Sequence, residues 1–272
     1  MRLCLRLLLP LALLVAGCGK VVDASKFTSA RLLDDGRTIV YAVHELVYRP
    51  ASGLAAVPDG GIPDYLKYAA VVGRYDRSSG RVMATTRLDT ARWLPGQGAA
   101  SIIDARGDWV LVRCAGQLHD TLQSATAYFV LQGVALAVQP LDLDARLQAN
   151  GLTLTELYFA DARGTLAAVV TRADGNREIR CRLADGTWRA PLAGQLQQVD
   201  DSEVFIWQGG QQLLGYDPVR DLRRMVPANT VPPRPEPAAG VTVANDRLEY
   251  GIRADSGWQY APLPLTLADA LP

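Results

Sequence analysis

Residues 154–191 read LTELYFADARGTLAAVVTRADGNREIRCRLADGTWRAP, and this stretch decides the fold class. It contains four short runs rich in apolar and β-branched residues, at 154–159, 165–171, 177–183 and 188–191. Turns that contain Asp and Gly separate the runs, and a step such as Asp185-Gly186 favours a tight hairpin. Short β-rich runs punctuated in this way are typical of antiparallel strands. The stretch therefore predicts one four-stranded antiparallel sheet.

The first half of this unit recurs along the chain. Asp-Ala-Arg-Gly occurs at 104–107 and again at 161–164, each time beside apolar runs. Weaker copies with the same order of apolar run, polar turn and apolar run lie at 32–40, 199–207 and 243–250. Such repetition is typical of a β-propeller, whose blades are four-stranded sheets of about 40–50 residues. We predict an all-β propeller of about five blades; a divergent sixth blade, or a β-sandwich or barrel in place of the propeller, are the alternatives.

The repeated unit resembles the blades of the TolB and WD40-like propeller families, where an Asp-Gly turn lies between the first strands. The Gly-His and Trp-Asp signatures are absent from the sequence, so the resemblance is one of pattern. It implies a single propeller-like domain over residues 27–272. Residues 51–64, rich in Gly, Ala and Pro, are expected to loop out of the first blade. Residues 228–240 contain four prolines, which cannot donate to a sheet ladder, and are expected to form an exposed connection.

The N-terminus has the three parts of a secretory signal peptide. Residues 1–6 contain two arginines and no acid, residues 7–15 are apolar and uncharged, and two small residues precede Cys18. This order of charge, apolar core and small residues is typical of a cleaved leader. The apolar run is far shorter than the roughly 20 residues that span a bilayer as a helix. We therefore assign residues 1–17 to a signal peptide.

Residues 15–18, Val-Ala-Gly-Cys, resemble the lipobox of bacterial lipoprotein precursors. The resemblance implies cleavage before Cys18, lipidation of its thiol and acylation of its new amino group, since several acyl chains hold a membrane durably. Residues 18–26 would then be a tether. Gly19, where retained lipoproteins carry Asp, implies the outer membrane, facing the periplasm. The alternative is an ordinary signal peptide followed by a chance cysteine.

Charge and composition exclude several classes of protein. The 272 residues contain 28 basic and 28 acidic side chains, and this balance argues against a nucleic-acid binder. A hydrophobic fraction of 49% and a charged fraction of 21% argue against disorder. Removal of Arg2 and Arg6 with the leader leaves a small acidic excess. Only Lys20, Lys26 and Lys67 are lysines, so the positive charge is nearly all arginine.

Two cysteines remain in the mature chain besides Cys18. Cys114 and Cys181 form an even pair in an oxidising compartment, which is compatible with a disulfide between neighbouring blades. The alternative is two buried free thiols. The sequence has no Cys-x-x-Cys or His-x-x-x-His spacing, so we predict neither a metal site nor a cofactor.

The sequence contains no recognisable catalytic set. His119 is followed by Asp120, but neighbours on an extended chain point to opposite faces, so they are not a ready-made dyad. No nucleophile elbow, phosphate-binding loop or dinucleotide fingerprint is found. Carboxylates recur in the repeated turns and are expected on one rim, with arginines beside them: Asp34, Asp104 and Arg106, Asp161 and Arg163. They either bind a cation or basic partner or, as we favour, accept hydrogen bonds from turn amides.

We expect a non-enzymatic scaffold that binds other envelope proteins and is held on the membrane through the lipid on Cys18. The alternative is a propeller enzyme or small-ligand binder that uses the central channel. That alternative requires His44, His119 and the turn carboxylates to meet in one pocket. The third hypothesis for the function is a purely structural envelope lipoprotein without a specific ligand.

Overall fold

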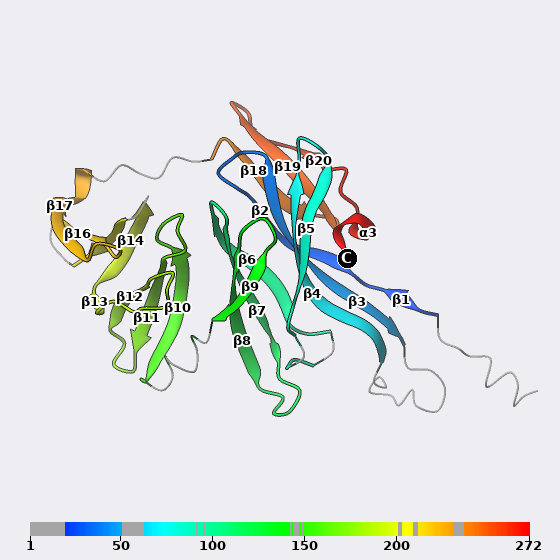
Figure 1. The fold of residues 1–272 in the computed structure, drawn as a ribbon, viewed down its shortest axis with the longest axis horizontal. Coiled ribbons are helices and arrows are strands. Elements are labelled where there is room, and N and C mark those ends of the chain that lie inside the picture. Colours follow the sequence, from blue (N-terminus) through cyan, green and yellow to red (C-terminus); the bar gives the residue numbers. More distant parts are fainter. Residues whose placement is uncertain are drawn as a thin grey trace, which may run out of the picture.

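The computed structural model shows an all-β chain (Figure 1). It describes residues 20–50, 63–90, 92–94, 96–141, 143, 147, 150–200, 203–208, 212–230 and 237–272. The signal peptide, Cys18, Gly19 and most of the insertions expected at 51–64 and 228–240 lie outside the described residues.

Consecutive strands form the first three sheets, all antiparallel. The first sheet contains β1 (Val22–Asp23), β2 (Lys26–Leu32), β3 (Thr38–Arg49), β4 (Asp64–Asp76) and β5 (Arg81–Leu88). The second contains β6 (Ala99–Arg106), β7 (Trp109–Gln117), β8 (Ser124–Gln132) and β9 (Ala137–Leu141). The third contains β10 (Leu152–Phe159), β11 (Leu166–Arg172), β12 (Arg177–Arg182) and β13 (Leu192–Ala193).

The remaining strands form two further sheets before a short terminal helix. The fourth sheet contains β14 (Gln195–Asp200), β15 (Glu203–Trp207), β16 (Gln212–Asp217) and β17 (Leu222–Pro227), followed by the 3-10 turn η2 (Ala228–Thr230). The fifth contains β18 (Ala239–Ala244), β19 (Arg247–Ala254) and β20 (Gly257–Pro262), followed by helix α3 (Leu267–Ala270).

The prediction of an all-β chain with about five propeller-like sheets is confirmed. The fifth sheet differs from the expected four-stranded blade, because three strands form it in the described part of the chain. The strand expected at 188–191 is also displaced: Trp188 forms an isolated bridge with Arg182, and Leu192 pairs with Ile179 instead. The first sheet begins at Val22, inside the stretch assigned to the tether.

The sheets follow one another through their first strands. β2 packs beside both β18 and β6, and β6 packs beside β10, while β12 adjoins β14. The order in space is therefore fifth, first, second, third and fourth sheet. Its two ends, β17 and β18, are consecutive in the chain but lie well apart (Figure 1).

A β-bulge recurs in one strand of each of the first four sheets, namely β2, β6, β10 and β14. The register against the second strand shifts between Phe27 and Ser29, Ile102 and Asp104, Leu154 and Glu156, and Leu196 and Gln198. A bulge leaves one residue outside the ladder and increases the local twist. The repeat is thus visible in backbone geometry as well as in the turns.

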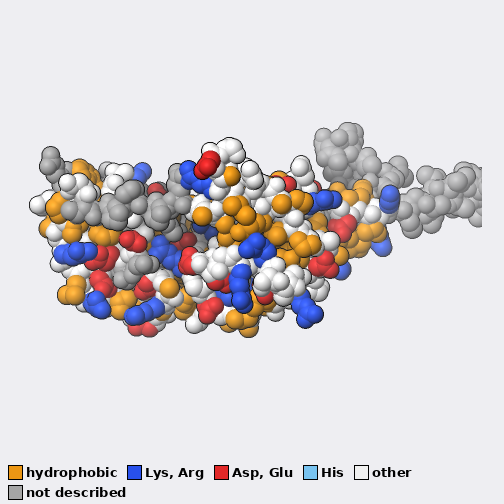
Figure 2. Space-filling view, turned by 90° about the horizontal axis from the view of Figure 1, so that it is seen from above, with side chains coloured by type: hydrophobic (Ala, Val, Ile, Leu, Met, Phe, Trp, Pro, Cys, Tyr) orange, Lys and Arg blue, Asp and Glu red, His pale blue; other side chains and the backbone are white. Residues whose placement is uncertain are grey.

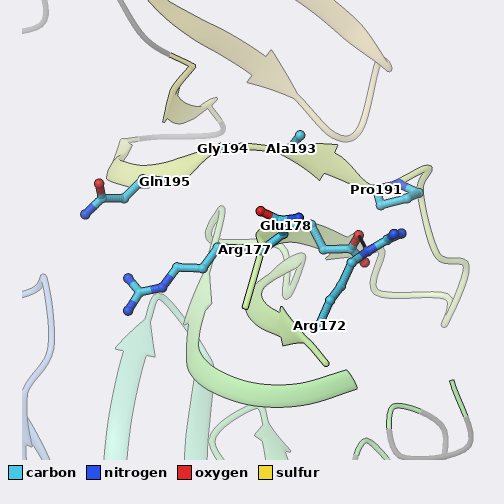
Figure 3. A pocket seen from close by; sticks show the side chains of 8 residues that line it. Arg172, Arg177, Glu178, Pro191, Ala193, Gly194 and Gln195 are labelled. Atoms are coloured by element: carbon cyan, nitrogen blue, oxygen red, sulfur yellow. Dashed lines mark hydrogen bonds and ion pairs between the residues drawn. The ribbon is translucent and has the colours of Figure 1, made fainter. Parts of the chain in front are cut away.

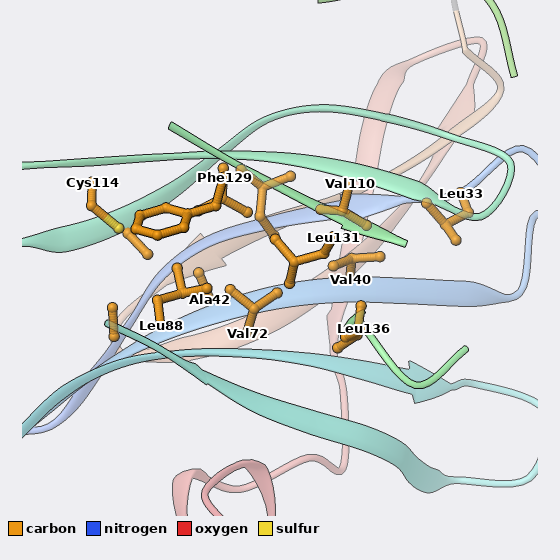
Figure 4. Packing of buried hydrophobic residues seen from close by; sticks show 14 of the residues in the cluster. Leu33, Val40, Ala42, Val72, Leu88, Val110, Cys114, Phe129, Leu131 and Leu136 are labelled. Atoms are coloured by element: carbon orange, nitrogen blue, oxygen red, sulfur yellow. The ribbon is translucent and has the colours of Figure 1, made fainter. Parts of the chain in front are cut away.

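The strand β3 lies between two hydrophobic layers. Val40 and Ala42 pack with Val110 and Leu131 of the second sheet (Figure 4). The alternate residues of β3 instead face a layer that includes Leu248 of the fifth sheet. A strand buried on both faces reads as a continuous apolar run, as residues 39–43 do.

Gly164 allows close contact between the second and third sheets. Its φ of +89° is a left-handed conformation, and an added Cβ would lie 2.7 Å from the Trp109 ring. Gly36 has a similar φ of +68° in the first sheet but has no atom within 4 Å of such a Cβ. The two glycines therefore share a conformational requirement and differ in their surroundings.

We expect Gly164→Ala to destabilise the protein more than Gly36→Ala. The left-handed conformation alone costs an alanine about 1–2 kcal/mol. The clash with Trp109 adds about 1–3 kcal/mol, the usual effect of overpacking. Urea unfolding of the two variants measures the difference. Equal free energies of unfolding would show that Gly164 is required by its φ alone.

Candidate functional site

The turn carboxylates do not occupy equivalent places, which corrects the prediction that they share one rim. Asp104 lies within β6, directly after the bulge, and is buried. Its Oδ2 accepts a hydrogen bond from the Phe159 N–H at 2.8 Å, and its Oδ1 accepts one from the Ala105 N–H at 2.9 Å. Asp104 therefore ties the second sheet to the third.

The reason is that the two Asp-Ala-Arg-Gly copies fall in different registers. The first copy ends its strand, since Arg106 pairs with Trp109 across a two-residue turn. The second copy lies after β10, in the connection between the paired residues Phe159 and Leu166. The same four residues thus lie at the end of a strand in the second sheet and within a longer turn in the third sheet.

In the longer turns the carboxylates bind backbone amides, as the favoured interpretation expects. Asp161 Oδ1 accepts hydrogen bonds from the N–H groups of Arg163 and Thr165, at 2.8 and 2.9 Å. In the first sheet Asp35 does the same for Thr38 at 2.8 Å, and Asp34 beside it is exposed. Burial acts to raise the pKa of Asp35, but hydrogen bonds from Thr38 and Arg37 outweigh it and lower that pKa.

The predicted arginines also separate. Arg163 is exposed on its turn, whereas Arg106 is buried and its Nη2 donates to the Val199 carbonyl of the fourth sheet at 3.3 Å. Arg31 makes a similar link, donating from Nη2 to the Ile103 carbonyl at 2.7 Å. Arginines of the first strands thus hold neighbouring strands together and do not surround the turn carboxylates.

Other polar side chains of the first strands are also engaged. Tyr158 donates to Glu156 Oε2 at 2.6 Å, and this bond, with burial, raises the pKa of Tyr158 to about 12. Thr28 Oγ1 donates to the Ala100 carbonyl at 2.6 Å, which joins the first and second sheets. The first bond lies within β10 and the second joins two sheets, so both are structural hydrogen bonds.

The histidines do not meet the carboxylates. His44 is buried in β3, where burial and the charge of Lys26 lower its pKa, whereas His119 is exposed. The neighbouring Glu45 is buried and forms an ion pair with Arg87 at 2.9 Å. In the described part of the chain, the pockets of about 360, 530 and 780 Å³ are lined by none of His44, His119, Asp104 and Asp161.

One predicted residue does line a cavity, which we call the rim notch. It has a volume of about 360 Å³ between the first and second sheets, and its polar lining is Asp34, Asp35, Arg37, Thr38, Arg74 and Asp108. Arg74 is only 3% exposed and binds the Asp108 carboxylate at 3.2 Å and its carbonyl at 2.9 Å. The Arg74 Nε is buried without a hydrogen-bond partner. The notch therefore combines a buried cation with carboxylates at its mouth.

A larger open cleft lies on the third sheet and was not predicted. Its volume is about 780 Å³, and Arg172, Arg177, Glu178 and Gln195 line it. Glu178 accepts from Arg172 Nε at 2.8 Å and from Arg180 Nε at 2.6 Å. Burial acts to raise the pKa of Glu178, but the two arginines outweigh it and lower that pKa. Arg177 points away from this ion pair (Figure 3).

The alternation Arg177-Glu178-Ile179-Arg180 was the available signal for this cleft. It places Glu178 and Arg180 on one face of β12, because alternate residues of a strand share a face. The sequence did not show that Arg172 of the preceding strand completes the ion pair. A third pocket of about 530 Å³ lies nearby, lined in part by Arg182, Asp185 and Trp188.

The disulfide, one of the two alternatives for Cys114 and Cys181, is not present in the structure. Cys114 and Cys181 are both free and buried. Cys114 packs in the cluster between the first and second sheets, whereas Cys181 packs between the third and fourth. Burial raises the pKa of each thiol to about 12. The alternative of two buried thiols is the one the structure contains.

Neither a metal cluster nor a membrane-spanning helix is found in the described part of the chain. No group of three or more His, Cys, Asp or Glu side chains there is placed to hold a metal ion. No described helix is long and apolar enough to cross a bilayer.

Replacement of Asp104 by Ala is expected to destabilise the fold by about 1–3 kcal/mol, because it leaves the buried Phe159 N–H without a partner. The matched control is Asp34→Ala on the exposed turn, which we expect to change the free energy of unfolding by no more than about 0.5 kcal/mol. Urea unfolding measures both. A cost for Asp104→Ala as small as that of the control would contradict the role of this bond.

The two core thiols are expected to stay unreacted in the native protein at pH 8. With a pKa of about 12, only about one thiol in ten thousand is ionised at that pH. Labelling with a thiol reagent, followed by peptide mapping, should modify Cys114 and Cys181 only after unfolding. A peptide pair joined through these residues in the unreduced protein would restore the disulfide.

Comparisons with known proteins give no family for this chain. No protein-family model and no curated protein matches it. Among solved structures it is similar to a chain from a structural and mechanistic study of two prolyl endopeptidases, with 16% identity and a TM-score of 0.34. The match covers 92% of this chain and 34% of the other, so this chain spans about a third of that protein.

Proposed function

We propose that the chain is a lipid-anchored, non-enzymatic scaffold of the bacterial envelope, which presents its rim notch to partner proteins. The observation that carries the proposal is the position of the notch relative to the N-terminus. Asp34, Asp35 and Thr38 line the notch at the start of β3, whereas β1 pairs at the other end, where Val22 lies opposite Tyr48.

The length of β3 separates these two ends. Residues 38–49 of a strand span roughly 40 Å at about 3.3 Å per residue. A lipid on Cys18 would be only four residues from Val22, within roughly 14 Å of it even if fully extended. The far end of β3 would therefore lie near the bilayer and the notch would face away from it.

The side chains near this anchored end suit a membrane surface. Tyr65 lies between Tyr48 and Tyr68, with ring centroids 6.1 and 6.4 Å away. Leu66 and Val21 are exposed beside them. Tyrosines and basic residues are enriched where proteins meet the headgroup layer, which supports this orientation.

The chemistry of the notch favours a basic segment of a partner. Arg74 already neutralises part of Asp108, Arg37 is paired with Asp76 at 4.0 Å, and Asp35 is held by its own turn. The exposed Asp34 carboxylate is therefore available to an incoming cation. Over the face seen in Figure 2, acidic and basic side chains are interspersed, so the notch provides a local acidic feature on a mixed surface. Among the described residues the histidines and turn carboxylates lie apart, so they do not form the pocket that the channel-enzyme alternative requires.

A photo-crosslinking residue at Asp34 is expected to capture an envelope protein in cells, whereas the same residue at Leu66 should capture lipid. Asp34→Lys should abolish co-purification of the captured protein, because it reverses the charge at the mouth of the notch. Arg220→Glu, a charge reversal on the exposed turn after β16, is the matched control and should leave it unchanged. Capture of lipid at Asp34, or of no protein there, would contradict the proposal.

A further inference from the structure

The outer edges of the five sheets differ in how they are protected. Exposed strand edges invite pairing with another chain, and proteins block them with charge, proline or short length. β5 carries Arg81 and Arg87, β9 carries Pro140 within five residues, β13 has two residues, and β17 carries Arg223 and Arg224. β20, with the sequence GWQYAP, contains no charged residue and ends in its only proline.

The outer edge of β20 is open in the structure. In the described residues β20 pairs with β19 alone, and all six of its residues are exposed. The Leu263 N–H donates to the Leu248 carbonyl at 2.8 Å on the same ladder. Hydrogen-bonded and non-hydrogen-bonded pairs alternate, so Ala261 and Gln259 bond to β19. The backbone groups of Trp258 and Tyr260 therefore point to the open edge.

The same two residues carry an ordered aromatic surface. The rings of Trp258 and Tyr260 are stacked with centroids 5.8 Å apart and are 38% and 47% exposed. They lie over glycines of the inner strands, where a Cβ on Gly251 would be 2.5 Å from the Tyr260 ring. Large aromatic side chains held in place before binding are typical of contact surfaces.

We propose that β20 pairs antiparallel with β20 of a second copy of this chain, so that the two fifth sheets form one continuous sheet. A two-fold axis at Gln259 sets Trp258 of one copy opposite Tyr260 of the other. Each of these pairs joins residues whose N–H and C=O groups point outward, so both backbone bonds form. The aromatic rings then lie on one face across the axis, as an isologous interface requires.

A second copy fits this edge better than an unrelated strand because the edge is self-complementary. Shifting the register by two residues toward the C-terminus would pair Trp258 with Pro262, which has no N–H to donate. With the two-fold axis at Gln259, the outward N–H and C=O groups of both Trp258 and Tyr260 form hydrogen bonds, and no charged side chain lies opposite one of like charge. The inference does not depend on the lipid anchor or on the rim notch.

Cysteine cross-linking of the purified full chain tests the register. Opposite residues of a non-hydrogen-bonded pair have Cα atoms about 4.5 Å apart, within disulfide range, so Gln259→Cys should give a disulfide-linked dimer on oxidation. Ala261→Cys is the matched control on the same face of the same strand. Its two copies would lie about 13 Å apart, beyond that range. Equal cross-linking of the two variants, or none of Gln259→Cys, overturns the proposal.

The mass of the protein provides a second measurement. We expect the wild-type chain in detergent to sediment as two copies, and Tyr260→Pro to halve that mass, because proline removes an outward N–H that β19 does not use. Adding Tyr260→Pro to Gln259→Cys should abolish the cross-link. A wild-type mass of one chain throughout the concentration range overturns the proposal. That result would not bear on the scaffold function, which the cross-linking experiment at Asp34 tests separately.

Discussion

The structure depends on how the bulged first strands satisfy their backbone groups where sheets meet. A bulge removes a residue from the ladder, and a buried carbonyl or N–H without a partner costs about 1–3 kcal/mol. Side-chain hydrogen bonds are present at three of the four bulges. The Ile103 carbonyl accepts from Arg31, and Thr28 and Thr155 donate their hydroxyls to the Ala100 and Val169 carbonyls. At Ile103 the strand therefore gains twist without leaving the bulged carbonyl unpaired.

The first sheet can lie between the fifth and second sheets because β3 is apolar on both faces. One face of β3 packs against the second sheet and the other against the fifth. The N-terminal sheet therefore contacts both the next sheet along the chain and the C-terminal sheet. Tyr41 joins these features, since its ring fills the space above Gly73 and its hydroxyl donates to the Ala270 carbonyl at 3.2 Å. Burial raises the pKa of Tyr41, so this phenol remains protonated and able to donate.

The sequence allowed the first three strands of the third sheet to be predicted because periodicity and turn residues are local signals, whereas the fourth strand lies at Leu192–Ala193 and not at 188–191. The positions of Asp104 and Arg106 could not be predicted, since the same Asp-Ala-Arg-Gly ends a strand at one site and forms a longer turn at the other. Turn length is set by packing against the next sheet, which the four residues do not encode. Likewise, Cys114 and Cys181 are in neighbouring sheets but pack in different hydrophobic clusters. Which neighbouring sheet a given face of a strand packs against depends on the tertiary structure, so it could not be predicted from the sequence.

The predominance of arginine over lysine also has a structural explanation. Several arginines cross from one sheet to another: Arg77 to the Tyr250 ring at 4.0 Å, Arg74 to Asp108, Arg106 to Val199, and Arg189 to the carbonyls of Pro218 and Val219 at 2.8 and 2.9 Å. A planar guanidinium donates several bonds in fixed directions and stacks on rings, whereas a lysine ammonium is a strongly hydrated point charge. Where two propeller-like sheets meet, one guanidinium can bind two consecutive carbonyls at a strand end, as Arg189 does with Pro218 and Val219. Lysine would satisfy such pairs less completely and would lose more hydration on burial, so these positions select arginine whatever the overall charge of the chain.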